Sequence, residues 1–546
     1  MNFITQKLRY FARTHLPMLV SFTLALFAIE LCLRKITNIT NSLNFQEVIL
    51  TSLAMILLIT FSTRIVKVFL ILFLFIGLVF QSSNAIFYGG WIDPMNIYLL
   101  FENLSEVIKT IPGLSYAVII KSTLFLGFTI LLLGYTYKVA SKHKGYVLVN
   151  ILVFVVFAFQ PMRDGAVYPE NVEKRFTKDT HSLIRSFHNS YGVFSAMLIS
   201  DAMGNDLYPA HRLPSYAQLK QPSHDVPNIF IYYGESLSSK YMSEYGYPVE
   251  TSPLLTKLTK QEGVYALSRE TVAGAAATMP STTRFFHMIE KPDARKQVSS
   301  FETSLFRYAQ EAGLTTTYIS TQGESYVNHI FKLAVGKYSN HYFTPPALDE
   351  SLTDREEGDD SLVFKALTKI DDGTPFFTVF QPNGSHTPFN AKSPKAFKKF
   401  GSDSEIKEYE NSVHYTDYIL NKLYDEVTKR SGDKPWLLFI TSDHGTYVDD
   451  KHITRSMSYP ASYMVPGVIL TNSKELYQEN IEPYQDCQYL FHRNFSEMIA
   501  RSLGRDVPIG KCDSGVLFSG MLTGFGAQQV TISEQNTVDL QPFGQK

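Results

Sequence analysis

The distribution of apolar residues constrains this chain most, because five long apolar stretches fall within the first 160 of its 546 residues. They are approximately residues 15–33, 48–61, 66–86, 117–135 and 146–159. A helix needs ~20 residues to cross the hydrocarbon core of a bilayer, so the second and fifth stretches must borrow flanking residues. The first stretch lacks a small-residue cleavage site and is followed by more apolar stretches. The sequence therefore predicts five membrane-spanning helices over residues 1–162, not a cleaved signal peptide.

The charged residues between these stretches indicate the orientation of the membrane part. Lys and Arg gather at the N-terminus, between stretches two and three, and between stretches four and five: Lys7, Arg9, Arg13, Arg64, Lys67, Lys138, Lys142 and Lys144. Arg34 and Lys35 are the exceptions on the other side. Cytoplasmic loops carry such an excess of positive charge. The N-terminus is therefore predicted inside, and an odd number of spans places the C-terminal part outside the cytoplasm.

The remainder of the chain divides into three predicted parts. Residues 163–226 mix aromatic and charged side chains, as expected for amphipathic helices on a membrane surface or for a linker packed on the soluble domain. Residues 227–525 have the composition of a soluble globular domain, and residues 526–546 form a polar tail expected to be loose. Cys487 and Cys512 form either a disulfide or two unpaired thiols. Lys and Arg number 50 against 51 Asp and Glu, a balance that indicates no nucleic-acid partner.

The soluble part alternates short apolar runs with helical stretches. Strands are predicted at residues 228–233, 315–320, 376–380 and 436–441, and helices at residues 304–312 and 405–429. This alternation predicts an α/β domain with a mostly parallel central sheet. Polar residues collect where the four strands end: Glu235, Gln322, Glu324, Asn383, Ser385, His386, Asp443 and His444. Because the carboxyl ends of strands in open α/β sheets form the ligand crevice, we expect a site at this edge.

Glu235, Asp443 and His444 offer two carboxylates and an imidazole at that edge. These ligand types suit Zn²⁺ or Mn²⁺. Asp443 and His444 are adjacent, and both reach one metal if the backbone turns sharply, which Gly445 permits. An Asp-His-Gly turn by itself is more often structural than metal-binding, so this interpretation depends on the surrounding motifs.

The chain carries an ordered series of such motifs. They are Gly234-Glu235-Ser236, Tyr245-Gly246-Tyr247 with Glu250-Thr251-Ser252-Pro253, residues 304–323, Gly384-Ser385-His386-Thr387-Pro388, Tyr409-Glu410-Asn411 with Tyr415-Thr416-Asp417-Tyr418, and Thr441-Ser442-Asp443-His444-Gly445. The series, together with the five apolar stretches, resembles the membrane phosphoethanolamine transferases of the alkaline phosphatase/sulfatase superfamily. The resemblance covers nearly the whole chain, and the order of the motifs is far more specific than any one of them.

The resemblance implies the roles of particular residues. Glu235, Asp443 and His444 would be metal ligands, joined by a threonine whose metal-held hydroxyl attacks phosphorus. His386 and His452 match two further histidines of the family, which face the transferred phosphate or a second metal and can protonate the leaving alkoxide. The alternative for His452 is an exposed loop histidine after two aspartates and a lysine.

Thr278 is the predicted nucleophile. It stands after three alanines and before Pro280-Ser281, where small residues and an early proline predict a helix start. Its spacing resembles the Cys-x-Pro-Ser core of sulfatases. The usual transferase pattern instead places the threonine five residues before the proline, a position that Ala275 occupies here. Thr271 is the reserve candidate, and a plain helix cap is the alternative role of Thr278.

These expectations combine into a predicted enzyme of the bacterial inner membrane, with its catalytic domain in the periplasm. Phosphatidylethanolamine would give phosphoethanolamine to Thr278, and lipid A, a lipopolysaccharide core sugar or another envelope glycan would accept it. A phosphatidylglycerol-dependent phosphoglycerol transferase is the first alternative, and an inactive scaffold of the same fold is the second. Thr446, where the family usually has Glu, and the small number of cysteines depart from the family pattern. A true sulfatase needs a Cys or Ser convertible to formylglycine, which Thr278 does not supply.

Overall fold

The computed structural model describes most of the chain in two compact units. The described residues are 15–37, 43–88, 91–92, 97, 116–168, 172–176, 181–203, 214–219, 225–292, 295–370, 373–450, 453–455, 457–518, 527–533 and 537–542. The units are Met1–Pro209 and Ala210–Lys546, so the division falls inside the predicted linker.

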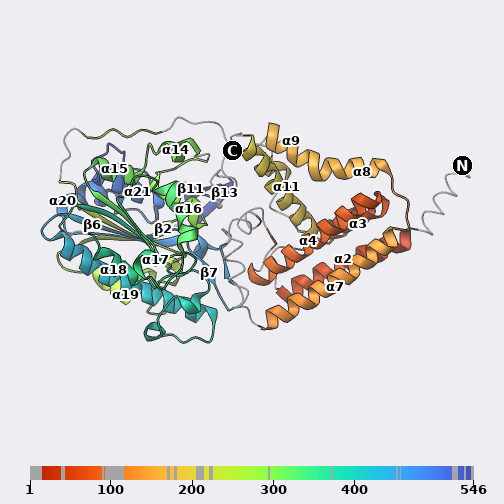
Figure 1. Cartoon of the computed structure of the whole chain (residues 1–546), viewed down its shortest axis with the longest axis horizontal. Coiled ribbons are helices and arrows are strands. Elements are labelled where there is room, and N and C mark those ends of the chain that lie inside the picture. Colours follow the sequence, from red (N-terminus) through yellow and green to blue (C-terminus); the bar gives the residue numbers. More distant parts are fainter. Residues whose placement is uncertain are drawn as a thin grey trace, which may run out of the picture. The chain divides into compact units, whose positions relative to one another are not determined.

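The N-terminal unit is helical (Figure 1). Its helices are α2 (Leu16–Thr37), α3 (Phe45–Phe61), α4 (Arg64–Tyr88), α7 (Tyr116–Ala140), α8 (Val147–Phe154), the π-helical turn η2 (Val155–Phe159), α9 (Gln160–Val167), α10 (Val172–Arg175) and α11 (Leu183–Ala202). All five predicted apolar stretches are therefore helical. The longer helices α2, α3, α4 and α7 follow from runs of apolar residues long enough to propagate a helix.

Three of these helical segments are long and apolar enough to cross a membrane by length and composition: Leu16–Lys35, Arg64–Ala85 and Val147–Val167. The last segment contains the fifth predicted stretch, residues 146–159, which is short by itself. It reaches spanning length because η2 and α9 continue α8 without a break. Phe45–Phe61 and Phe125–Ala140 are shorter apolar helices among the described residues. The structure thus supports an apolar helical unit, while the count of five spans stays a prediction.

Within the N-terminal unit, α11 packs against the apolar helices. The ring of Phe187 lies 4.9 Å from that of Phe73 in α4, and Gln81 donates to the carbonyl oxygen of Leu183. Phe187 and Leu183 are buried in the same hydrophobic cluster as the helices α2 to α8. The residues that the sequence assigned to a surface-lying linker therefore bury part of their apolar face against neighbouring helices.

An eight-stranded sheet forms the centre of the C-terminal unit (Figure 1). Its strand order is β10 (Leu490–Phe491), β2 (Tyr265–Val272), β9 (Met464–Thr471), β6 (Trp436–Ser442), β1 (Asn228–Gly234), β5 (Phe376–Gln381), β3 (Thr315–Ser320) and β4 (His341–Phe343). Strand β9 runs antiparallel to both of its neighbours, and the other neighbouring pairs are parallel. The prediction of a mostly parallel α/β sheet is confirmed, as are the four predicted strands.

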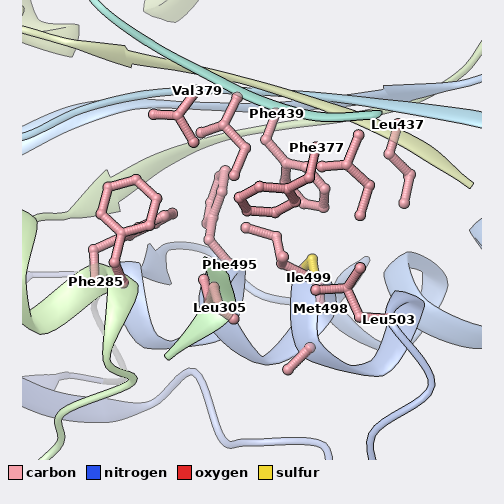
Figure 2. Packing of buried hydrophobic residues seen from close by; sticks show 14 of the residues in the cluster. Phe285, Leu305, Phe377, Val379, Leu437, Phe439, Phe495, Met498, Ile499 and Leu503 are labelled. Carbon is pink, nitrogen blue, oxygen red and sulfur yellow. The ribbon is translucent and has the colours of Figure 1, made fainter. Parts of the chain in front are cut away.

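Helices cover both faces of this sheet, since consecutive strand residues point to opposite sides. Leu437 and Phe439 of β6 pack with the first layer of helices, whereas Leu438 and Ile440 pack with the second. The first layer, part of which Figure 2 shows, contains α13 (Thr278–Phe286), α15 (Leu305–Glu311), α16 (Glu324–Ala334) and α21 (His492–Ser502). The second contains α12 (Pro253–Leu258), α17 (Pro345–Leu348), α18 (Leu362–Leu367) and α19 (Glu405–Ser431).

Shorter elements complete the unit. They are α14 (Arg295–Ser300), α20 (Lys474–Leu476) and the hairpin of β7 (Tyr447–Val448) and β8 (Ile453–Thr454). Cys487 and Cys512 are joined in a disulfide, which resolves the choice that the sequence left open. The bridge ties the segment before α21 to the segment that enters the small C-terminal sheet.

The expectation of a loose C-terminal tail is wrong for its described residues. Strands β12 (Gln528–Ile532) and β13 (Val538–Pro542) pair antiparallel with each other, and β12 also pairs with β11 (Ser514–Leu517). Val530 is fully buried and packs with Val272 and Met464 of the main sheet. The polar composition of the tail concealed a period-2 apolar pattern, which is the strand signal.

Candidate metal centre and active site

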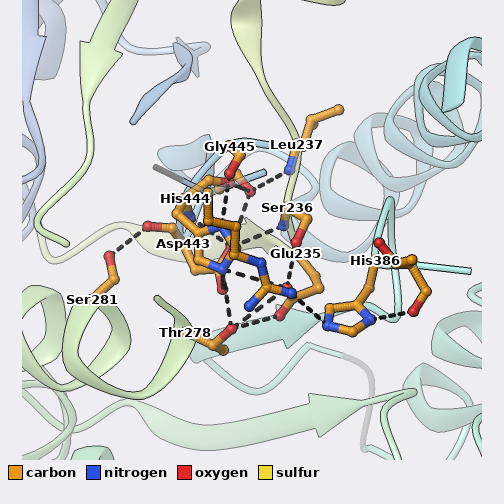
Figure 3. A network of polar contacts seen from close by, with 12 residues as sticks. Glu235, Ser236, Leu237, Thr278, Ser281, His386, Asp443, His444 and Gly445 are labelled. Carbon is orange, nitrogen blue, oxygen red and sulfur yellow. Dashed lines mark hydrogen bonds and ion pairs between the residues drawn. The ribbon is translucent and has the colours of Figure 1, made fainter. Parts of the chain in front are cut away.

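The predicted site residues meet at the carboxyl ends of the parallel strands. Glu235 follows β1, and Asp443 and His444 follow β6, the neighbouring strand with Gly234 paired to Ser442. The candidate ligand atoms of the three residues all lie within 4.8 Å of one another, and all three side chains are buried. Figure 3 shows them converging with Thr278. In the part of the chain that the structure describes, no other group of three such residues has this geometry.

The orientation of Asp443 leaves one carboxylate oxygen for a cation. Its Oδ1 accepts hydrogen bonds from the backbone N–H groups of Ser236, at 3.0 Å, and of His444, at 2.6 Å. Its Oδ2 is buried and has no hydrogen-bond partner. A buried carboxylate oxygen without a donor is costly unless a cation satisfies it. The residues present therefore fit a bound divalent metal.

The imidazole of His444 is oriented for the same purpose. Its Nδ1 lies 2.9 Å from the carbonyl oxygen of Gly445, so Nδ1 carries the proton and donates it. The lone pair of Nε2 then faces the cluster, 3.4 Å from Asp443 Oδ2 and 3.7 Å from Glu235 Oε1. A backbone carbonyl that fixes the tautomer in this way is typical of metal-ligating histidines.

Glu235 is held by polar neighbours on both oxygens. Ser236 Oγ donates to Oε1 at 2.8 Å, and Gln322 Nε2, at the end of β3, donates to Oε2 at 3.0 Å. Ser236 itself has a φ of 57°, a left-handed conformation that is uncommon for a residue other than glycine and that clusters at functional sites. The end of β3 thus contributes an orienting amide, as its predicted place at the sheet edge implied.

Gly445 is needed for a different reason than the sequence suggested. Its φ is not in the left-handed region, so a sharp turn does not demand glycine there. A Cβ at this position would instead lie 2.1 Å from the carbonyl oxygen of Ala461. Close approach of two backbone segments, rather than turn geometry, excludes any side chain after Asp443-His444.

Burial controls the ionisation of the cluster in the absence of metal. Desolvation, followed by the neighbouring Asp443 charge, raises the pKa of Glu235 to about 7. Desolvation also raises the pKa of Asp443. For His444, desolvation and then the positive charge of Arg455 lower the pKa to about 4. At neutral pH the imidazole is therefore a neutral ligand, whereas the carboxyl of Glu235 is only partly ionised until a cation compensates its charge.

We expect zinc binding to strengthen as pH rises toward about 7, because the metal must displace the proton of Glu235 below that pKa. A raised carboxyl pKa favours the metal-free fold at low pH, and that contribution is lost as pH rises through about 7. The melting-temperature difference between zinc-loaded and chelated protein should therefore widen between about pH 5.5 and about pH 8. Differential scanning fluorimetry measures it. A difference that stays constant or narrows with pH would contradict this account, and Glu235→Gln is the control in which it should not widen.

Thr278 lies directly beside the three candidate ligands. Its Oγ1 is 3.2 Å from Glu235 Oε2 and 3.3 Å from His444 Nε2, and the residue is buried (Figure 3). It is the first residue of α13, and Ala277 is the N-cap, without a side-chain cap bond. The hydroxyl of Thr278 is therefore turned to the cluster rather than used as a helix cap. Ser281 Oγ of the same turn donates to the carbonyl oxygen of Asp443, which holds the helix start against β6.

The other two nucleophile positions lie elsewhere. Thr271 is fully buried within β2, and its hydroxyl donates to the carbonyl oxygen of Arg269 at 3.4 Å. Ala275 forms an isolated bridge with Phe518, and its methyl group is buried there. Of the three positions, Thr278 is the one whose hydroxyl the structure brings to the candidate ligands.

The two additional histidines have different outcomes. His452 lies outside the described residues. His386 follows β5, with Nδ1 2.6 Å from the carbonyl oxygen of Thr387 and Nε2 2.7 Å from Nη2 of Arg455. These contacts place the proton of His386 on Nδ1 and make Nε2 an acceptor. The role of His386 as a proton donor to the leaving alkoxide stays a prediction. Sequence reasoning missed Arg455, whose only signal was a cation in the polar segment after Asp443-His444.

Comparisons with known proteins agree with this fold. A model of the Sulfatase family matches residues 227–496. The chain is 24% identical over 356 residues to Kdo(2)-lipid A phosphoethanolamine 7''-transferase of Escherichia coli K12, covering 59% of either chain. It is 22% identical over 284 residues to phosphoethanolamine transferase EptC of Escherichia coli O18:K1:H7, covering 48% of either chain. The chain thus spans less than two thirds of the length of these relatives.

The solved structures extend the likeness to the N-terminal unit. The integral membrane protein lipooligosaccharide phosphoethanolamine transferase A (EptA) from Neisseria meningitidis superposes with a TM-score of 0.56 at 14% identity, over 90% of this chain and 95% of that one. At this identity the match shows a shared fold. The C-terminal unit is in turn similar to the Sulfatase family over residues 227–496. Both curated relatives are named as phosphoethanolamine transferases, and so is the membrane protein whose fold the chain shares.

Proposed function

We propose that this chain transfers phosphoethanolamine from phosphatidylethanolamine to an acceptor of the bacterial cell envelope, through a covalent intermediate on Thr278. The observation that carries the proposal is the position of the Thr278 hydroxyl, within 3.3 Å of both Glu235 and His444 at the start of a helix. The first amides of α13 favour an anion at that point. A nucleophile, a candidate metal cluster and an anion-binding helix start thus coincide.

The transfer has two balanced halves. In the first, the bond from Thr278 Oγ1 to phosphorus forms while the bond from phosphorus to the diacylglycerol oxygen breaks. The hydroxyl proton passes to Glu235 Oε2, to which Thr278 already donates, and then to solvent, while the diacylglycerol oxygen takes a proton from water. In the second half the oxygen of an acceptor hydroxyl bonds to phosphorus while the bond from phosphorus to Thr278 Oγ1 breaks. The acceptor proton passes to solvent, and Thr278 Oγ1 takes a proton back from solvent. No net proton is consumed in either half.

A divalent ion, which we propose to be Zn²⁺ with Mn²⁺ as the alternative, would be held by Glu235, Asp443, His444 and Thr278. When bound, it supplies a positive charge that favours the ionised hydroxyl and the charge developing on the phosphoryl group. The protein itself buries these side chains away from water and fixes their orientation through the backbone and side-chain donors described above. Because the charged groups are already oriented, they need little rearrangement as the transition state forms.

The membrane setting fits a lipid donor. We propose residues 1–162 as a five-span domain of the inner membrane, residues 163–226 as its surface segment, and the sulfatase-like domain as periplasmic. An anchored site meets a lipid substrate at the surface where that lipid resides. For the acceptor we propose lipid A, a lipopolysaccharide core sugar or another envelope glycan, since the first two relatives are named as phosphoethanolamine transferases and one of them as acting on Kdo(2)-lipid A.

The test is adduct mapping on purified full-length protein incubated separately with phosphatidylethanolamine and with phosphatidylglycerol. A phosphoethanolamine adduct on Thr278, formed only with the first lipid, is the expected result. A glycerophosphate adduct would replace the donor with phosphatidylglycerol. The absence of any adduct and of diacylglycerol release with both lipids would overturn the enzyme proposal and leave the inactive scaffold.

A further inference from the structure

A half-buried guanidinium lies at the edge of the candidate metal cluster. Arg455 follows β8 and reaches the segment after β5, where its Nη2 is 2.7 Å from His386 Nε2. Figure 3 shows His386 beside Glu235 and Thr278 in the same polar network. A permanent positive charge therefore stands beside the residues that receive the phosphoryl group.

A count of the charges in the site indicates that one divalent ion does not neutralise all of the negative charge, and the Arg455 guanidinium would compensate the remainder. Glu235 and Asp443 together carry two negative charges when ionised, which one divalent ion neutralises. A phosphodiester brings one further negative charge, and charge accumulates on its non-bridging oxygens as the nucleophile attacks. Within the described residues, Glu235, Asp443 and His444 form the one group of three that could hold a metal ion, and a cationic side chain beside them would supply a second positive charge.

His386 is suited to position that side chain rather than to hold a second ion. Its Nδ1–H is used by the Thr387 carbonyl oxygen, and its Nε2 lone pair accepts from Arg455. An imidazole lone pair that accepts a guanidinium N–H is not available to a metal at the same time. The contact fixes one N–H of the guanidinium group and, because the group is planar, the plane in which its other donors lie.

We propose that Arg455 binds a non-bridging oxygen of the transferred phosphoryl group, supplying the second positive charge of a one-metal site, and that His386 is its positioning residue. The inference rests on the proposed function and deepens it by naming the group that recognises the phosphoryl. Arg455 keeps its proton throughout and only donates hydrogen bonds, so the balance of the transfer is unchanged. Arginine fits this task because its planar fork matches phosphoryl oxygens.

The experiment uses full-length protein in detergent and compares Arg455→Ala, Arg455→Lys and His386→Ala with wild type. Affinity for inorganic orthovanadate is measured by calorimetry, zinc content by elemental analysis, and adduct formation on Thr278 by single-turnover mass spectrometry. Arg307→Ala, which removes an arginine from an exposed helical ion pair with Glu311, is the control for loss of an arginine. Thermal unfolding checks that each variant is folded.

We expect wild type to hold one zinc per chain and Arg455→Ala to keep it. Orthovanadate should bind about 100-fold more weakly to Arg455→Ala, and the adduct should form about 10³-fold more slowly. Added guanidinium ion should restore part of the rate of this variant, an effect that a merely structural arginine would not show. Arg455→Lys should retain part of the affinity for orthovanadate. His386→Ala should bind orthovanadate about tenfold more weakly while retaining its zinc.

Three results would overturn the inference: two zinc ions per wild-type chain, orthovanadate affinity of Arg455→Ala within threefold of wild type, or a slow variant that guanidinium does not rescue. Failure of the proposed function looks different, because orthovanadate binding needs no lipid substrate. A wild type that binds orthovanadate through Arg455 but forms no adduct would sink the transferase proposal alone. If wild type and Arg455→Ala form the adduct at the same rate, the inference alone is overturned and the proposed function stands.

Discussion

Replacement of Thr278 by valine is expected to abolish adduct formation and to reduce phosphoethanolamine transfer by about 10⁴-fold or more. Valine has the same shape but no hydroxyl, so the contacts of the buried side chain survive while the nucleophile disappears. The bonds from Ser281 to Asp443 and from Ser236 to Glu235 remain, and the cluster should keep its geometry. Diacylglycerol release from labelled phosphatidylethanolamine measures the loss, and zinc content should stay at the wild-type level within about twofold.

Thr271 provides the matched control for this prediction. Thr271→Val makes the same chemical change in β2, where the hydroxyl donates to the backbone oxygen of Arg269. It should keep transfer within about threefold and cost at most a small amount of stability. Thr278→Ser keeps a hydroxyl and should still form the adduct. If Thr271→Val loses the adduct and Thr278→Val still forms it, Thr271 rather than Thr278 is the nucleophile.

Replacement of Asp443 by asparagine is expected to weaken zinc binding strongly and to lower transfer by about 10³-fold or more. Asparagine Oδ1 can still accept the backbone N–H bonds of Ser236 and His444, so the turn after β6 is retained. The unsatisfied Oδ2 becomes an amide group, which donates hydrogen bonds and repels a cation. A chelator should therefore no longer change the melting temperature of this variant.

Asp425→Asn is the control for Asp443→Asn, because it makes the same change at an exposed position of α19. It should leave zinc content, transfer and the effect of the chelator unchanged. If Asp443→Asn held stoichiometric zinc at wild-type affinity, the assignment of the metal to this cluster would be wrong. If it lost zinc but kept transfer, the metal would be structural and the catalytic proposal would need another source of charge.

The central strands and the metal cluster were predictable because their signals are local. β1 and β6 are short runs of large apolar residues, buried at every position, and such runs are typical of strands covered on both faces. Parallel strands have their carboxyl ends at one edge, so residues that directly follow β1 and β6 had to be neighbours. The long helix α19 was predictable for a similar reason, since its apolar period persists over many turns.

The residues that the sequence misjudged depend on contacts between distant segments. Arg455 contacts His386, which lies 69 positions earlier in the sequence. The β7–β8 hairpin that precedes Arg455 has strands of two residues, which are too short to show a hydrophobic pattern. The tail strands are stabilised by pairing with β11 and by burial of Val530 against the main sheet. Strand propensity is largely the response of a side chain to such neighbours, so a polar segment read alone does not reveal it.

The amino-acid sequence by itself determined the apolar N-terminal helices, the α/β class of the second unit, and the edge at which Glu235, Asp443 and His444 meet. Each of these follows from hydrophobic periodicity and from which residue comes next after a strand. Tertiary structure alone decided that the hydroxyl of Thr278 faces the cluster while Thr271 is buried within β2, that Cys487 pairs with Cys512, and that Arg455 stands beside His386. Those outcomes depend on where separate segments are brought together by burial of a shared core, and no local pattern encodes that placement.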